Sequence, residues 1–307
     1  MFDLIIIGGG PAGTAAAVYA ARKQLKTCMI IKEWGGQSTV SSDIQNWIGT
    51  PHISGSELGD SFKKHAYEYK GEFLGIQEGA CATKVEKSDT GFNVTLESGT
   101  SIASKVVLIA TGSSRRKLGI PGSNTFEHKG VVYCASCDGP VFSGMNVVVV
   151  GGGNAGFESA AQLLAYCPVV TLLNRGETFR ADAITVEKLS QNPKLTIIKN
   201  AIPAEVHGEK FVTGISYTDA LTGEIKKIDC GGVFVEIGQI PATGLVRGLV
   251  DMTEGGQIKI DARTQKTSLP GVWAAGDCTD VLYHQNNIAA GDAVRALEDI
   301  YLAIKTS

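Results

Sequence analysis

Two stretches of this sequence repeat one pattern, an apolar run followed by a glycine-rich turn and an alanine-rich segment. The first joins Phe2–Ile7 to Gly8-Gly9-Gly10-Pro11-Ala12-Gly13, and the second joins Asn146–Val150 to Gly151-Gly152-Gly153-Asn154-Ala155-Gly156. Strand, GxGxxG and helix together are typical of a dinucleotide site, because the glycines allow a tight turn, close approach of the pyrophosphate and close helix packing. Two copies predict two nucleotide-binding domains and a duplication of about domain size.

Side chains after the first fingerprint are candidates for contacts with its nucleotide. A second apolar strand, Thr27–Ile31, leads to Glu33, which stands about 20 residues past Gly13, where an acid can bind a ribose hydroxyl. Gln37 and Asn46 carry amides that could hydrogen-bond a heteroaromatic ring. Turn formation explains the same two residues equally well, so both interpretations stay open.

The order of the segments predicts that one domain is inserted into the other. Ser113–Gly122 is basic, ends in Pro-Gly and interrupts the strand pattern, and Gly238–Pro241 forms a second break. After it the chain returns to a short apolar strand, Val272–Ala275, and a long helix, Ile288–Ile304. We therefore expect an α/β fold with two Rossmann-like domains, one from residues 1–112 and 241–307 and one from 113–240. We also expect the inserted domain to turn about its two crossings during catalysis.

Composition narrows the function classes. The net charge of −3 gives no reason to expect nucleic acid or an anionic membrane as a partner. No run of about 18 apolar residues occurs, so we expect no transmembrane helix. The chain enters its first strand without a basic leader, which favours the cytoplasm over secretion.

The seven cysteines include one closely spaced pair, Cys134 and Cys137, which is followed directly by Asp138 and Gly139. A structural zinc site needs four ligands, and the remaining cysteines and the five histidines lack ligand-like spacing, so we expect no metal. A redox-active CxxC between two nucleotide sites indicates an electron relay. The other cysteines are expected to be packing residues. A protein whose CxxC only senses redox state remains an alternative.

Together these motifs resemble the low-molecular-weight thioredoxin reductases, a family of flavoprotein disulfide reductases, over essentially the whole chain. The matching marks are Gly8–Gly13, Gly36-Gln37, Asn46-Trp47, Ala110–Gly112, Cys134–Gly139, Gly151–Gly156 and Gly276-Asp277. The resemblance implies FAD on the first domain, NADPH on the inserted domain, a thioredoxin-like acceptor and a homodimer. It also implies that Cys134 attacks the outside disulfide, that Cys137 faces the flavin and that Asp138 manages the protons.

The site residues follow from the motifs and the resemblance together. For FAD the candidates are Gly8, Gly10, Pro11, Ala12, Gly13, Glu33, Gln37, Asn46, Gly112, Gly276, Asp277 and Gln285. For the nicotinamide nucleotide they are Gly151, Gly153, Asn154, Ala155, Gly156, Glu158, Arg175 and Arg180. Glu158, expected on the first turn of its helix, could contact the nicotinamide end or simply complement the helix dipole. His284 is expected near the flavin ring or in a capping role.

Two departures from the family pattern leave the donor and the acceptor open. Where the family usually has His-Arg-Arg, this chain reads Asn174-Arg175-Gly176, so we expect a modest NADPH preference with NADH usable. A ferredoxin-like donor is the alternative if neither nicotinamide works. The segments Gly276–Thr279 and Tyr283–Gln285 are more similar to the flavoprotein component of alkyl hydroperoxide reductase. Another small redoxin or a peroxidase-linked carrier is therefore an alternative acceptor.

Overall fold

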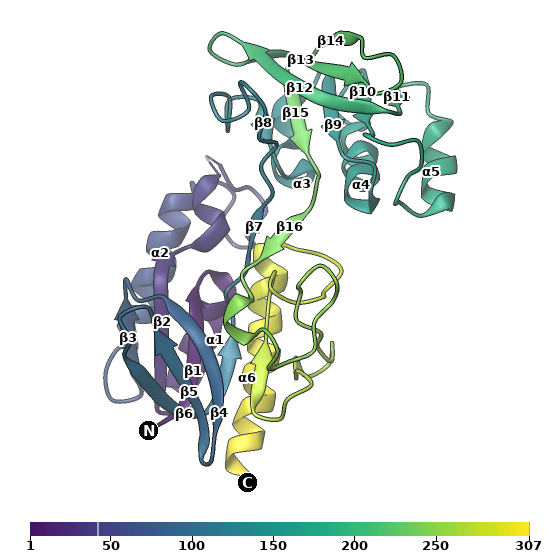
Figure 1. Ribbon diagram of the computed structural model, residues 1–307. Coiled ribbons are helices and arrows are strands. Elements are labelled where there is room, and N and C mark those ends of the chain that lie inside the picture. The colour runs from purple at the N-terminus through teal and green to yellow at the C-terminus, as the bar shows by residue number, and fades with distance from the viewer. Residues whose placement is uncertain (42, 307) are drawn as a thin grey trace. The chain divides into compact units, whose positions relative to one another are not determined.

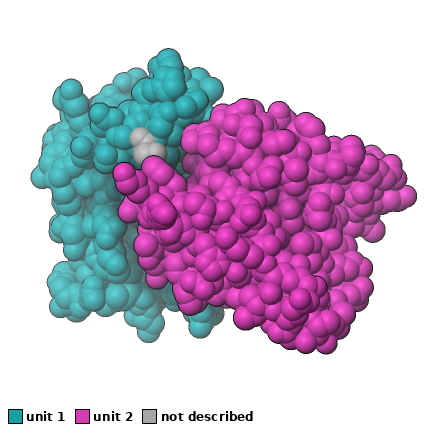
Figure 2. Space-filling model, turned by 90° about the horizontal axis from the view of Figure 1, so that it is seen from above, with its two compact units in different colours: residues 1–114, 240–307 teal, residues 115–239 magenta. Residues whose placement is uncertain are grey.

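The computed structural model describes residues 1–41 and 43–306, and Figure 1 shows its helices and strands. The chain divides into two compact units, here called unit 1 (residues 1–114 and 240 onward) and unit 2 (residues 115–239), which Figure 2 colours teal and magenta. Unit 2 is thus an insertion in the sequence of unit 1. Each unit contains parallel strands with helices, so the predicted fold class is confirmed.

Unit 1 is built on a seven-stranded sheet with the order β3-β2-β1-β6-β5-β4, in which β17 also pairs with β6. Strand β1 (Phe2–Gly9) lies between β2 and β6 and is parallel to both. Its residues Leu4, Ile5 and Ile6 are fully buried. A strand covered on both faces needs such a continuous apolar run, which is why the sequence does not alternate here. Alanines of helices α1 and α6 pack against one face of the sheet.

The remaining elements of unit 1 lie on both sides of the insertion. They are α1 (Pro11–Arg22), β2 (Thr27–Trp34), η1 (Gly36–Val40), α2 (Gly55–Glu68), β3 (Leu74–Glu78), β4 (Ala82–Ser88), β5 (Gly91–Leu96), β6 (Ser101–Ile109), η3 (Gly244–Val246), β17 (Val272–Ala274) and α6 (Asn286–Lys305). Among the described residues, no helix is long and apolar enough to cross a membrane.

Unit 2 is built on a five-stranded parallel sheet with the order β11-β10-β9-β15-β8. One face packs against α4 through Val149, Phe157 and Phe234. The other face packs against the three-stranded antiparallel sheet β12-β13-β14 through Val148, Val150 and other buried side chains. The elements are β8 (Val131–Val132), α3 (Ala135–Asp138), η2 (Gly139–Phe142), β9 (Val147–Val150), α4 (Asn154–Leu163), β10 (Val170–Leu173), α5 (Ala183–Ser190), β11 (Leu195–Ile198), β12 (Ala201–Gly208), β13 (Val212–Asp219), β14 (Ile225–Asp229) and β15 (Gly232–Val235).

The two segments that connect the units pair with each other. They form a two-stranded sheet of β7 (Ser113–Arg115) and β16 (Gln239–Pro241). The amide of Arg116 donates to the carbonyl of Gly238 (3.1 Å), and the amide of Ala242 donates to the carbonyl of Gly112 (3.0 Å). This register shows that the outgoing and returning segments run antiparallel. Figure 1 labels these two segments β7 and β16.

Candidate active site

The first fingerprint forms a turn that only glycines can make. Gly8 has a φ of +131°, and a Cβ on it would overlap the carbonyl of Ala110. A Cβ on Gly13 would overlap the carbonyl of Gly8, so α1 can pack closely against β1. Gly10 is the N-cap of α1, which has no side-chain cap and no acid in its first turn. The free N–H groups at this helix start can therefore bind an anion such as a pyrophosphate.

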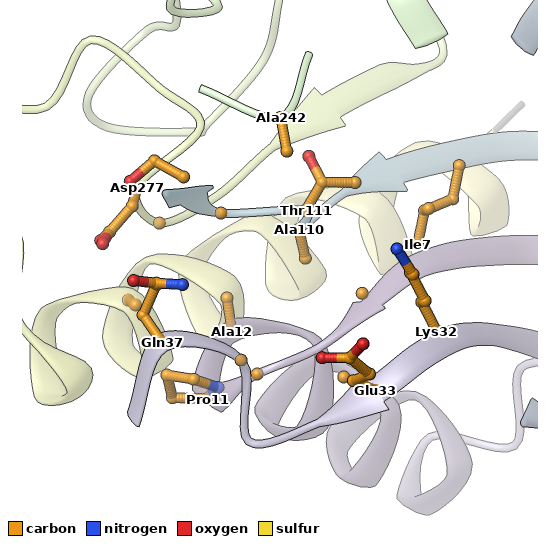
Figure 3. A pocket seen from close by; sticks show the side chains of 18 of the residues that line it. Ile7, Pro11, Ala12, Lys32, Glu33, Gln37, Ala110, Thr111, Ala242 and Asp277 are labelled. Carbon is orange, nitrogen blue, oxygen red and sulfur yellow. The ribbon is translucent and has the colours of Figure 1, made fainter. Parts of the chain in front are cut away.

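A cavity of about 330 Å³ opens at this turn. Its lining includes the candidates Gly8, Gly10, Pro11, Ala12, Glu33, Gln37, Gly112, Gly276 and Asp277. Figure 3 shows Glu33 and Lys32 at one end and Gln37 and Asp277 at the other. An acid for a ribose, free helix N–H groups for a pyrophosphate and polar groups at the far end fit the parts of FAD in order.

Three candidate FAD residues, Gly13, Asn46 and Gln285, are not in the cavity lining. Gly13 contributes indirectly, because its lack of a side chain lets α1 pack closely against β1. The Asn46 amide donates to Oε1 of Gln285 (3.0 Å), and the Asn287 amide donates to the backbone carbonyl of Asn46 (2.7 Å). These hydrogen bonds hold the loop that carries Asn46 against the start of α6, where Gln285 is the N-cap residue.

His284 lies beside the cavity residue Asp277. Its Nδ1 atom is 3.4 Å from Oδ1 of Asp277, which is an ion-pair distance. The ring is not in the cavity lining, so its contact with the cavity runs through Asp277.

The second fingerprint repeats this geometry in unit 2. Gly151 has a φ of +135°, and a Cβ on Gly156 would overlap the carbonyl of Gly151. Gly153 is the N-cap of α4, again without a side-chain cap or a first-turn acid. Glu158 is exposed and lies in the second turn, because the helix begins at Asn154. This corrects the expectation that Glu158 would lie on the first turn.

The loop after β10 presents two cations to solvent. The buried Asn174 donates its amide to the carbonyls of Gly176 (2.7 Å) and Thr178 (3.0 Å), which braces the loop. Arg175 and Arg180 are exposed, and neither guanidinium has a hydrogen bond or ion pair to the described residues. Guanidinium groups of this kind can bind a phosphate in a bidentate way.

Cys134 and Cys137 form a disulfide at the start of α3, directly after β8. Sγ of Cys134 also accepts a hydrogen bond from the amide of Cys137 (3.1 Å). Both residues are half-buried. Three of the other cysteines differ, because burial raises the pKa of Cys28 and Cys278 to about 11 and that of Cys230 to about 12. Such thiols stay protonated and unreactive at neutral pH.

Asp138 follows the disulfide and is placed to exchange protons. Burial raises the pKa of its carboxyl to about 6. The carboxyl makes no hydrogen bond or ion pair within the part of the chain that the structure describes. A group with a pKa near neutrality can both take up and release a proton under physiological conditions. No cluster of three metal-ligating side chains occurs among the described residues.

The structure also places an acid that the sequence reasoning missed. Glu236 follows β15 directly, and its amide donates to the carbonyl of Val150 at the end of β9 (2.8 Å). It therefore lies beside the second fingerprint. An acid at the end of an unbroken apolar strand was the available signal, since the carboxyl ends of parallel strands share one edge.

Comparison with known proteins agrees with this geometry. The model of the pyridine nucleotide-disulphide oxidoreductase family matches residues 2–299. The chain belongs to this family. Among solved structures of relatives, thioredoxin reductase from Streptococcus pyogenes superposes with a TM-score of 0.90 and 33% identity. That comparison covers 100% of this chain and 99% of the other.

Two curated relatives of this chain have names other than thioredoxin reductase. A protein named NADH dehydrogenase from Bacillus subtilis is 40% identical over 295 residues. A protein from Pseudomonas aeruginosa that is named as one component of alkyl hydroperoxide reductase is 39% identical over 296 residues. Each match covers 96% of this chain and 57% of the relative. The chain thus spans little more than half the length of these curated relatives.

Proposed function

We propose that this chain is an FAD-dependent disulfide oxidoreductase that passes electrons from NAD(P)H to a thioredoxin-like protein disulfide. One observation carries the proposal: the Cys134–Cys137 disulfide lies next to a half-buried acid of raised pKa, in a unit with its own dinucleotide fingerprint. The other fingerprint, in unit 1, has a separate cavity whose lining suits FAD. We assign FAD to unit 1 and the nicotinamide nucleotide to unit 2.

The chemistry on this chain is thiol–disulfide exchange. Bound FAD would supply the relay, taking a hydride from the nicotinamide and delivering two electrons to the Cys134–Cys137 disulfide. The Cys134 thiolate then attacks the partner disulfide, forming a mixed disulfide and releasing one partner thiolate. The Cys137 thiolate attacks Cys134, which re-forms the internal disulfide and releases the second partner thiolate. Asp138 holds and returns protons of the dithiol as it is formed and consumed.

The donor assignment rests on the loop after β10. Arg175 and Arg180 are free to bind the 2′-phosphate of NADPH, whereas Asn174 supplies no acid for the two ribose hydroxyls of NADH. Gly176 stands where the family has another arginine, and a lost charge-assisted contact costs about 1.5–3 kcal/mol, or roughly 10- to 150-fold in affinity. We therefore propose a modest NADPH preference with NADH usable. The name of the B. subtilis relative supports the use of NADH.

The similarity to the alkyl hydroperoxide reductase component from P. aeruginosa favours a second candidate acceptor, a peroxidase-linked redoxin. In both cases we propose a homodimer, as the resemblance to thioredoxin reductases implies. We also propose that it acts in a reducing cytoplasm. The acceptor surface would be the face of unit 2 that carries Cys134.

The test is steady-state turnover of the FAD-loaded chain with NADPH and with NADH against a panel of thioredoxins and peroxidase-linked redoxins. We expect flux with at least one thioredoxin-like acceptor and a disulfide that titrates with two electrons. A titratable disulfide with negligible flux to every acceptor would instead identify a redox sensor and refute the enzyme assignment. Flavin reduction only by reduced ferredoxin would refute the nicotinamide donor.

A further inference from the structure

Glu236 is a half-buried acid that has no role in the proposed relay. Its carboxyl oxygen Oε1 accepts a hydrogen bond from the hydroxyl of Ser159 on α4 (2.6 Å). No hydrogen bond to Oε2 occurs among the residues that the structure describes. Burial raises the pKa of this carboxyl, while the Ser159 hydrogen bond and the Arg115 charge oppose that rise.

The strand order indicates which part of a bound dinucleotide would reach Glu236. In the order β11-β10-β9-β15-β8, the connections reverse direction between β9 and β15, and dinucleotides bind across such a switch point. The pyrophosphate belongs at the start of α4, after β9. The cations Arg175 and Arg180 follow β10, on one side of β9, so the adenosine half lies there. The nicotinamide half must therefore extend to the other side, over the end of β15, where Glu236 stands.

We propose that Glu236 accepts a hydrogen bond from the carboxamide NH₂ of the nicotinamide ring, and so fixes which face of the ring is presented. The carboxamide is the polar group of the ring, and Oε2 is the acceptor left without a partner among the described residues. Ser159 is a positioning residue that holds the other oxygen. This inference rests on the proposed use of a nicotinamide donor.

The experiment compares two ligands that differ only at this NH₂ group. Titration calorimetry measures binding of NADP⁺ and of its 3-acetylpyridine analogue, which has a methyl group in place of NH₂, to the FAD-loaded chain at mildly alkaline pH. NAD⁺ and its 3-acetylpyridine analogue form a second pair. The variants are Glu236→Met, which removes the acceptor, and Glu236→Gln, which keeps an uncharged acceptor. Glu209→Gln, in the exposed turn after β12, is the charge-matched control.

The wild type should bind NADP⁺ about 10-fold more tightly than the analogue, since a charge-assisted hydrogen bond is lost. That ratio should fall to about one in Glu236→Met, be intermediate in Glu236→Gln and be unchanged in Glu209→Gln. Differences intrinsic to the two ligands cancel across the variants. An equal ratio in all four proteins would overturn the role of Glu236 while leaving the donor assignment standing. If neither NADP⁺ nor NAD⁺ binds the wild type, the nicotinamide donor itself is refuted, and this inference with it.

Discussion

Replacing Asp138 by asparagine should stabilise unit 2 and at the same time slow turnover. Burial raises the pKa of this carboxyl from 3.8 to about 6, so the folded state holds a proton that the unfolded chain releases between these two values. Stability is therefore lost as the pH rises through this window. The difference of about 2 pKa units corresponds to roughly 3 kcal/mol at about pH 8 and about half of that at about pH 5. Asparagine has a similar shape and no charge to bury.

The assay must report on unit 2. The three tryptophans, Trp34, Trp47 and Trp273, all lie in unit 1, so hydrogen exchange of the β9 and β15 amides is the better probe. Asp138→Asn should be more stable than wild type by an amount that grows between about pH 5 and pH 8. Turnover should fall by about 10²-fold, within the usual range for a general acid.

Asp219, in the same unit, provides a control whose contribution to stability changes with pH in the opposite direction. The amide of Leu221, the largest cause, and the Lys226 ammonium lower the pKa of Asp219. Its contribution to stability is therefore present at neutral pH and is lost as the pH falls through the folded pKa. Asp219→Asn should thus be less stable than wild type at about pH 8. If the advantage of Asp138→Asn over wild type did not grow with pH, burial would not be what perturbs Asp138.

Three further predictions follow from the same geometry. Cys134→Ser and Cys137→Ser should each abolish disulfide reduction yet keep FAD and its reduction by the nicotinamide; near-normal flux to a redoxin in either variant would refute the relay. Gly13→Ala should lose most of the flavin absorbance after purification, because its Cβ would overlap the carbonyl of Gly8; normal flavin content would show that the helix can shift. Arg175→Ala should weaken NADPH binding about 10-fold or more and leave NADH unchanged in stopped-flow flavin reduction; a strong NADH preference in wild type that the substitution leaves unaffected would contradict the phosphate role.

Local patterns predicted the central strands well, because burial on both faces leaves a continuous apolar run at β1 and β9. The elements that the sequence patterns did not predict share a physical cause. Strand β14 alternates between exposed and half-buried residues, and α5 has no buried residues, so neither shows a clear apolar period. The start of α5 was nevertheless readable, since Asp182 caps it by accepting from the amides of Ile184 and Thr185.

The candidate site likewise has features that the sequence predicts and features that it does not. The glycine turns are local, so the sequence predicts them from spacing alone. Contacts between distant segments are not local: the Asn46–Gln285 hydrogen bond joins residues 239 positions apart. Glu236 and Ser159 meet only because β15 lies beside β9 in the sheet. The periodic pattern of apolar residues in the sequence does not indicate which distant residues become neighbours.

The antiparallel pairing of β7 with β16 means that the chain leaves unit 1 and returns to it through neighbouring, paired segments. A two-residue hairpin turn suffices to join two strands paired in this way. Unit 1 could therefore be produced as a single shortened polypeptide in which such a turn replaces the whole insertion. The same arrangement would let an entire unit be gained, exchanged or deleted as one block of sequence, without a new path for the chain through the remaining core.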